Sequence, residues 1–354
     1  MAEARLRSIV VRAGARARAL IAREGFRPSL FGGLLGASGG PKWLALHGID
    51  RVLAERFLPR RGGPLALLGS SIGTFRHAAL AQRDPLAALE RFRAAYLAQR
   101  YSARPTPADV SEVSRQIVTE LLGASGAREI IERADLSTHV VTVRSRALTA
   151  SERRPLLALG LGASALANVV DRRLLGVGFE RVLFHTGAAP RMVPGTLPTR
   201  AVPLTAESLP DALLASGSIP LVLAGVRDVG GAPPGVYRDG GVVDYHFDFE
   251  LERPEGLLLM PHFSRELVPG WFDKGLRRRA RGPALDDLVL IAPSAEGQAR
   301  FPGGQVPDRK DFARFADPVR VSRWQAALGE SARMGDELAA LFEDPDPVRH
   351  MATL

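Results

Sequence analysis

The sequence contains no cysteine, which excludes disulfide bonds, zinc sites with cysteine ligands and thiol nucleophiles. Lysine is almost as scarce, because only Lys42, Lys274 and Lys310 among the 47 lysines and arginines are lysine. Aromatic residues make up 6% of the chain, so no stacking platform for nucleic-acid bases stands out. The net charge is +9, but the arginines are scattered among 38 acidic residues. We therefore expect no nucleic-acid partner.

Long uninterrupted apolar runs are also missing. The N-terminal stretch carries arginines throughout and lacks the apolar centre of a signal peptide. The longest apolar run, residues 155–170, includes Ser164 and Asn168 and is flanked by arginines. A membrane span needs about 20 apolar residues, so we expect a buried or interfacial segment within an insertion at about 147–179. We expect a cytoplasmic protein, and peripheral contact of this segment with a membrane surface stays open.

Predicted strands and helices alternate along the whole chain. Two successive units consist of a short apolar strand, a glycine-rich turn and a helix, which is typical of a parallel sheet with helices on its faces. Apolar spacing favours an opening helix over residues 6–21 and a closing helix over about 321–342. No linker divides the chain, so we expect one α/β domain over residues 1–354. After the first unit, strands are expected at 64–68, 138–143, 181–185, 235–238, 256–260 and 288–291.

Two stretches, GASGG at 36–40 and GSSIG at 69–73, share the pattern G-x-S-x-G. This pattern marks a strained turn that presents a serine nucleophile between a strand and a helix. In the second stretch the next helix begins at about Ile72, and its N-terminal amides would face the oxygen of Ser71. Ser71 is therefore the candidate nucleophile, and Ile72 is grouped with the substrate-binding residues.

The first stretch is better suited to holding negative charge. The consecutive glycines Gly39 and Gly40 allow backbone N–H groups to converge on an anion. Pro41 suits a first helical turn, and Lys42 follows it with a positive charge. We therefore interpret Gly39, Gly40 and Lys42 as candidate oxyanion-binding residues and Ser38 as part of their loop.

A serine nucleophile needs a base, and two residues qualify. His262 follows an apolar strand and would complete a Ser–Asp–His triad. Asp239 follows a short strand and precedes two glycines, so a sharp turn would hold its carboxylate at the same sheet edge as Ser71. A partly desolvated carboxylate bonded to a serine hydroxyl can act as a general base, and we prefer Asp239.

The three motifs GASGGPKW, GSSIG and DGG occur in the order and spacing of patatin-like phospholipases, which this chain resembles over about residues 30–250. The resemblance implies a three-layer αβα sandwich with a mostly parallel central sheet. It also implies a Ser71–Asp239 dyad, an oxyanion loop at Gly39, Gly40 and Lys42, and no cofactor or metal. The expected substrate is a lipid or another acyl ester. The family's loop usually begins with Asp-Gly-Gly-Gly, whereas here Ala37 and Ser38 stand in the first two places, which indicates a divergent branch.

Two other functions stay open. One is hydrolysis of small esters by Ser71 and His262, and the other is a catalytically silent lipid-binding or regulatory protein on the same fold. Asp244, His246 and Asp248 alternate as a metal cluster would, but a strand would place them on one face without metal, and we interpret them as structural. The arginine-rich run 277–281 is interpreted as a solvated loop, with contact to lipid phosphates as the alternative.

Overall fold

The structure, a computed structural model, describes residues 6–188, 197–249, 251–252, 255–276 and 278–354. Its strands are β1 (Ile9–Ala13), β2 (Phe31–Gly36), β3 (Leu65–Ser70), β4 (Leu136–Ser145), β5 (Phe179–His185), β6 (Thr199–Pro203), β7 (Val226–Arg227), β8 (Val236–Asp239), β9 (Leu257–Pro261), β10 (Leu288–Pro293) and β11 (Met351–Thr353). Its α-helices are α1 (Ala15–Glu24), α2 (His47–Val52), α3 (Ile72–Leu80), α4 (Pro85–Leu97), α5 (Pro107–Leu122), α6 (Gly126–Glu132), α7 (Arg154–Val170), α8 (Leu209–Gly217), α9 (Ala295–Arg300), α10 (Asp311–Arg314) and α11 (Asp317–Leu341).

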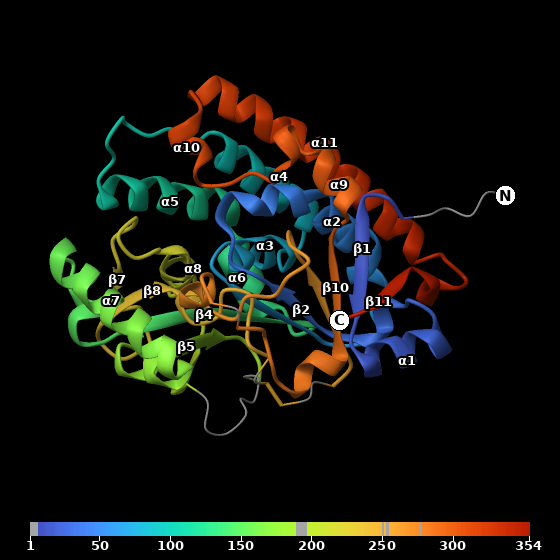
Figure 1. Cartoon of the computed structure of the whole chain (residues 1–354), viewed down its shortest axis with the longest axis horizontal. Coiled ribbons are helices and arrows are strands. Elements are labelled where there is room, and N and C mark those ends of the chain that lie inside the picture. Colours follow the sequence, from blue (N-terminus) through green and yellow to red (C-terminus); the bar gives the residue numbers. More distant parts are fainter. Residues whose placement is uncertain (1–5, 189–196, 250, 253–254, 277) are drawn as a thin grey trace.

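The strands join into one sheet in the order β11-β1-β10-β9-β2-β3-β4-β5-β6. In addition, β8 pairs with β4, and β7 pairs with β8. The five central strands β10, β9, β2, β3 and β4 run parallel to one another, whereas β1 and β5 on either side of them are antiparallel to β10 and β4. Their nearly continuous apolar sequences suit a sheet that is covered on both faces. Figure 1 shows α4, α5 and α11 together on one side of this sheet. The chain therefore has the expected three-layer α/β architecture with a mostly parallel sheet.

The predicted strands from 64–68 to 288–291 are confirmed, as is the closing helix at about 321–342. The prediction of an opening helix over residues 6–21 is wrong in its first half. Residues 9–13 form β1, which pairs antiparallel with β10 and parallel with β11. The β-branched residues Ile9, Val10 and Val11 favour a strand once partner strands are available. Only the second half of the segment is helical, in α1.

The apolar segment at about 147–179 lies between β4 and β5 and is mostly helical. Its main helix, α7, lies at the β5 end of the sheet, away from α1 (Figure 1). One face of α7 is buried through Leu157 and Leu161, and its other face leaves Leu166 and Val170 exposed. Within the described ranges, no helix combines the length and the apolar character needed to cross a bilayer.

Candidate active site

Ser71 occupies the turn between β3 and α3. Its backbone has φ 54° and ψ −129°, a region that residues other than glycine rarely adopt. The turn is held by hydrogen bonds, since the Ser71 N–H donates to Ser216 Oγ at 2.9 Å and the Thr74 hydroxyl donates to the Ser71 carbonyl at 2.7 Å. A strained serine between a strand and a helix is the geometry that G-x-S-x-G predicts.

Asp239 reaches Ser71 because two strands meet end to end along β4. β3 runs parallel to β4 and ends with Ser70 beside Val141. β8 runs antiparallel to β4 and ends with Asp239 beside Thr142, the next residue. The carboxyl ends of β3 and β8 therefore face each other on the same edge of β4. This arrangement joins residues that are far apart in the sequence.

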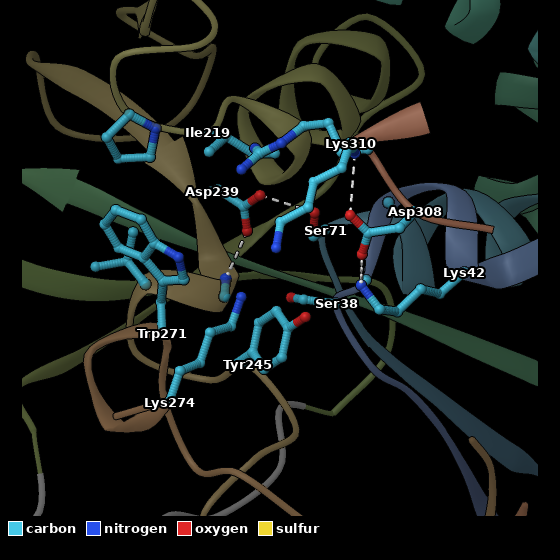
Figure 2. Close-up of a pocket in the computed structure, with 16 residues that line it drawn as sticks. Ser38, Lys42, Ser71, Ile219, Asp239, Tyr245, Trp271, Lys274, Asp308 and Lys310 are labelled. Atoms are coloured by element: carbon cyan, nitrogen blue, oxygen red, sulfur yellow. Dashed lines mark hydrogen bonds and ion pairs between the residues drawn. The ribbon is translucent and has the colours of Figure 1, made fainter. Parts of the chain in front are cut away.

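The Ser71 hydroxyl donates a hydrogen bond to Asp239 Oδ2 at 2.8 Å, and the Gly241 N–H donates to Asp239 Oδ1 at 2.7 Å (Figure 2). Both side chains are buried, with residue exposures of 4% for Ser71 and 6% for Asp239. Burial raises the pKa of Asp239 from 3.8 to about 6, although the two hydrogen bonds act in the opposite direction. At neutral pH Asp239 is therefore ionised and can take a proton from Ser71.

The glycine loop after β2 lies directly beside this turn. A Cβ on Gly73 would lie 2.0 Å from the Gly36 carbonyl oxygen, so the two turns approach more closely than any side chain permits. Gly40 has φ +55° and open space beside its Cα. Gly39 and Gly40 both line the pocket that contains Ser71 and Asp239. The loop then continues as a 3₁₀ helix, Gly40–Leu46, before α2 begins.

Ser38 is engaged in the loop itself. It is 2% exposed, its Oγ lies 3.0 Å from Ser70 Oγ, and its N–H donates to the Tyr245 carbonyl at 2.9 Å. The structure gives Ser38 no carboxylate or histidine partner among the described residues. Its surroundings differ from those of Ser71, although both serines match the same pattern.

Two cavities meet at Ser71. The first, the polar cavity, has a volume of about 330 Å³ and combines apolar residues such as Ile219 and Trp271 with charged ones, including Asp239 and all three lysines. The second has a volume of about 220 Å³ and is mostly apolar. Ile72 lines only this second cavity, together with Phe75, Tyr96, Ile117 and other apolar residues. Ser71 and Gly40 line both, so a molecule bound at Ser71 can extend into each cavity.

Lys42 forms an ion pair with Asp308, and its ammonium lies 5.6 Å from the centre of the Phe263 ring (Figure 2). This ion pair connects the glycine loop to the segment before α10. Lys42 therefore borders the cavity but already has a carboxylate partner.

His262, the alternative base, does not line either cavity at Ser71. It is fully buried, and its Nδ1 lies 2.6 Å from the carbonyl oxygen of Ser264. Burial lowers the pKa of His262 to about 4. The Ser71 hydroxyl has Asp239 as its partner, so the geometry does not support a triad through His262.

Of the three residues that alternate as a metal cluster would, the two aspartates form ion pairs with arginines. Asp244 accepts two hydrogen bonds from Arg181, at 2.6 and 2.9 Å, and Asp248 accepts one from Arg172 at 2.8 Å. His246 Nδ1 accepts a hydrogen bond from the Val268 N–H at 3.0 Å. The segment is an irregular loop, so the assumption of a strand was wrong. Within the part of the chain that is described, no group of acidic or histidine residues has the arrangement of a metal site.

The arginine run after Trp271 begins at residue 277, which lies outside the described residues. Arg278 donates to Asp273 at 2.8 Å and to the Asn168 side chain at 3.0 Å. This arginine therefore connects the loop to α7 and is not free to meet a ligand.

Several residues at the cavity were not predicted as site residues. They are Tyr245, Trp271, Lys274, Asp308, Arg309 and Lys310, and the buried Ser216 that accepts the Ser71 N–H was not predicted either. A signal for two of them was visible in the sequence, because lysine is rare in this arginine-rich chain. Both Lys274 and Lys310 are exceptions to that preference, as Lys42 is.

No model of a known protein family matches the chain, and no curated protein matches its sequence. Among solved structures, the chain is similar to VipD from Legionella pneumophila, with a TM-score of 0.33 and 12% sequence identity. The match covers 67% of this chain and 50% of VipD, so the chain spans about half the length of that protein. The function therefore has to be argued from the geometry of the site.

Proposed function

We propose that this protein is a serine acyl hydrolase that acts on lipid-like esters through a Ser71–Asp239 dyad. The observation that carries the proposal is the 2.8 Å hydrogen bond from a strained, buried serine to a buried carboxylate. The resemblance of three ordered motifs to patatin-like phospholipases supports the same conclusion. The apolar cavity supports an acyl chain as ligand, because a 150 Å³ apolar cavity holds a benzene molecule and this one is about half as large again.

In the proposed reaction, Ser71 Oγ attacks the ester carbonyl carbon while Asp239 accepts the hydroxyl proton. The carbonyl oxygen becomes an oxyanion, which the backbone N–H groups of Gly39 and Gly40 and the start of α3 at Ile72 would stabilise. The bond to the alcohol oxygen then breaks, and Asp239 transfers its proton to that oxygen. Water attacks the acyl-serine in the second half of the cycle, with Asp239 again taking the proton and returning it to Ser71.

A fluorophosphonate probe tests this proposal, because it forms a covalent adduct only with an activated serine. We expect one adduct, located on Ser71 by peptide mass spectrometry. Ser71→Ala should abolish labelling and lower turnover of p-nitrophenyl butyrate at least about 10⁴-fold. Ser38→Ala is the matched control, since Ser38 has the same sequence pattern and lies in the same pocket but has no carboxylate partner, and it should keep the adduct.

Two further variants separate the dyad from the triad. Asp239→Asn should abolish turnover, whereas His262→Asn should leave it largely unchanged, because Asn can repeat the bond that His262 Nδ1 makes with Ser264. Activity in Asp239→Asn together with its loss in His262→Asn would contradict the dyad. Absence of any adduct on a folded protein would favour the catalytically silent lipid-binding protein.

We also propose that α7 and its flanks contact a membrane surface when the protein reaches its substrate. Nine large apolar side chains are exposed in the described part of the chain, and eight of them lie between Leu148 and Val177. Leu166 is 73% exposed and Val170 is 80% exposed. The exposed side chains of Arg153 and Arg154 lie at the N-terminus of the helix, which suits an anionic lipid surface.

Sedimentation with phosphatidylglycerol vesicles tests this contact. The double variant Leu166→Ser/Val170→Ser should reduce the bound fraction. Val319→Ser removes the ninth exposed apolar side chain, on α11, and should not change binding. Equal binding of both variants and the native protein would show that α7 is not the contact surface.

A further inference from the structure

All three lysines of the chain line the polar cavity beside Ser71. Lys42 follows the glycine loop, Lys274 follows the short helix Trp271–Asp273, and Lys310 precedes α10. These positions are far apart in the sequence, and arginine supplies the positive charge almost everywhere else. Arg309 also lines the cavity. The convergence of the rare residue at one cavity indicates a shared role.

The cavity has more positive than negative side chains. Its four cations face two carboxylates, Asp239 and Asp308, and Asp308 is already paired with Lys42. Among the described residues, Lys274, Arg309 and Lys310 have no carboxylate within ion-pair distance. An anion bound in the cavity would give these three cations a negatively charged partner.

The Lys274 ammonium is placed next to the dyad. It lies 3.7 Å from the centre of the Tyr245 ring, and Figure 2 shows its side chain pointing into the cavity toward Asp239. The pKa of Lys274 is lowered to about 8, first by desolvation and then by the charges of Lys42 and Arg309, while Asp239 and Asp308 act in the opposite direction. A bound anion would relieve this repulsion.

The loop that carries Lys274 is fixed by its neighbour Asp273, which is fully buried. Asp273 accepts hydrogen bonds from Asn168 and Arg278, both at 2.8 Å, and from the Gly270 N–H at 2.9 Å. This network connects the loop to α7. Lys274 is therefore held at the cavity by a buried network, unlike a lysine on a free surface loop.

The turn that carries Lys310 is also fixed. The Lys310 N–H donates to Asp308 Oδ1 at 3.0 Å, and the Asp308 N–H donates to Asp311 Oδ2 at 3.0 Å. The ion pair between Asp308 and Lys42 connects this turn to the glycine loop. The two cationic loops thus border the dyad from different parts of the fold.

The position of Asp239 indicates which part of an ester would meet these cations. Asp239 lines the polar cavity and not the apolar one. In the proposed reaction Asp239 gives a proton to the departing alcohol oxygen, so the alcohol part must lie on its side of Ser71. The acyl part then extends into the apolar cavity.

We infer that the substrate is an acyl ester whose alcohol part carries an anionic phosphate or carboxylate group, bound by Lys274, Lys310 and Arg309. This inference rests on the proposed function and adds a substrate class to it. Lys274 and Lys310 determine specificity, because they discriminate between anionic and neutral alcohol parts. The dyad acts on the ester bond in either case.

Three octanoyl esters with the same acyl chain test the inference at concentrations below micelle formation: those of glycerol, of glycerol 3-phosphate and of glyceric acid. We expect kcat/KM to be at least about tenfold higher for an anionic ester than for the neutral one, because each charge-assisted hydrogen bond contributes that much. The better of the two anionic esters identifies the preferred group. Lys274→Gln and Lys310→Gln should each lower the anionic-to-neutral ratio about tenfold, mainly through KM.

Arg23→Gln is the matched control, because it removes one positive charge from an exposed position on α1. The control should leave the ratio unchanged, and Lys274→Arg should restore part of it. Equal kcat/KM values for the three esters, with Ser71 still labelled by the probe, would overturn the inference and leave the proposed function intact.

A binding experiment covers the case in which none of the esters is hydrolysed. Titration of Ser71→Ala with glycerol 3-phosphate in a calorimeter measures the anion site without catalysis. Binding that is lost in Ser71→Ala/Lys274→Gln supports the anion site, even if the hydrolase proposal fails. Absence of binding to Ser71→Ala would overturn the inference.

Discussion

Replacing Asp239 by asparagine should make the protein inactive and more stable at the same time. Asparagine has the same shape as aspartate, so its carbonyl oxygen can accept the Gly241 N–H while its amide group donates to Ser71 Oγ. The substitution removes the proposed base, because a neutral amide cannot take the serine proton. It also removes a carboxylate that is 6% exposed and ionised at neutral pH.

The size of the stability gain follows from the pKa of Asp239, which burial raises from 3.8 to about 6. Below pH 3.8 the carboxyl is protonated in both the folded and the unfolded protein, and its ionisation costs nothing. As the pH rises from 3.8 to 6, the unfolded state loses its proton first, so native stability falls. Above pH 6 the penalty is complete at about 3 kcal/mol, because one pKa unit corresponds to about 1.4 kcal/mol.

Urea denaturation of native protein and Asp239→Asn across a pH series measures this penalty. As the pH rises, the free energy of unfolding of Asp239→Asn should increase relative to that of the native protein. About 1 kcal/mol of this relative increase should occur between pH 5 and pH 7. Asp336→Asn, at an exposed site on α11, is the control and should show no comparable change. A difference that does not vary with pH would refute the claim that Asp239 is ionised at a cost.

Two other predictions concern the rate and the backbone. The kcat/KM for p-nitrophenyl butyrate should fall about tenfold for each pH unit below about 6, as Asp239 becomes protonated. Lys274→Gln should move the acidic limb of this pH–rate profile to higher pH, since the charge of Lys274 lowers the Asp239 pKa. A profile that does not move would contradict this coupling. Gly73→Ala should cost at least about 3 kcal/mol in urea denaturation, because its Cβ would lie 2.0 Å from the Gly36 carbonyl oxygen. Gly162→Ala, at an open position on α7, should instead gain up to about 1 kcal/mol, and equal effects of the two changes would contradict the close approach of the turns.

The sequence predicts most of the central sheet because the local signals there are consistent. Short apolar runs such as LALL at 65–68 and LVLI at 288–291 are bounded by turn residues, and both are strands. The N-terminal segment was assigned wrongly because its apolar spacing also fits a helix. Its pairing with β10 and β11, both near the C-terminus, decides the outcome. Such long-range pairing leaves no mark in a local window.

The candidate site shows the same division between local and long-range information. The turn at Ser71 and the sharp turn after Asp239 are visible as short motifs. Their contact depends on β8 continuing the edge of β4 beyond the end of β3, which the motifs do not encode. The cationic side of the cavity depends on two loops beyond residue 250, where the resemblance to a family ends. Lysine scarcity was the one signal that marked those loops.

The two copies of G-x-S-x-G lie side by side because β2 and β3 are neighbouring parallel strands and end at the same edge of the sheet. What distinguishes the two serines comes from elsewhere in the chain. Asp239, from β8, accepts a hydrogen bond from the Ser71 hydroxyl. The Ser38 N–H instead donates to the Tyr245 carbonyl, and the Ser38 hydroxyl is hydrogen-bonded to that of Ser70. Under the proposed function, the same five-residue pattern thus serves as a nucleophile turn in one place and as part of an anion-binding loop in the other. A segment about 170 residues later decides which, so the pattern alone identifies a turn and not a catalytic residue.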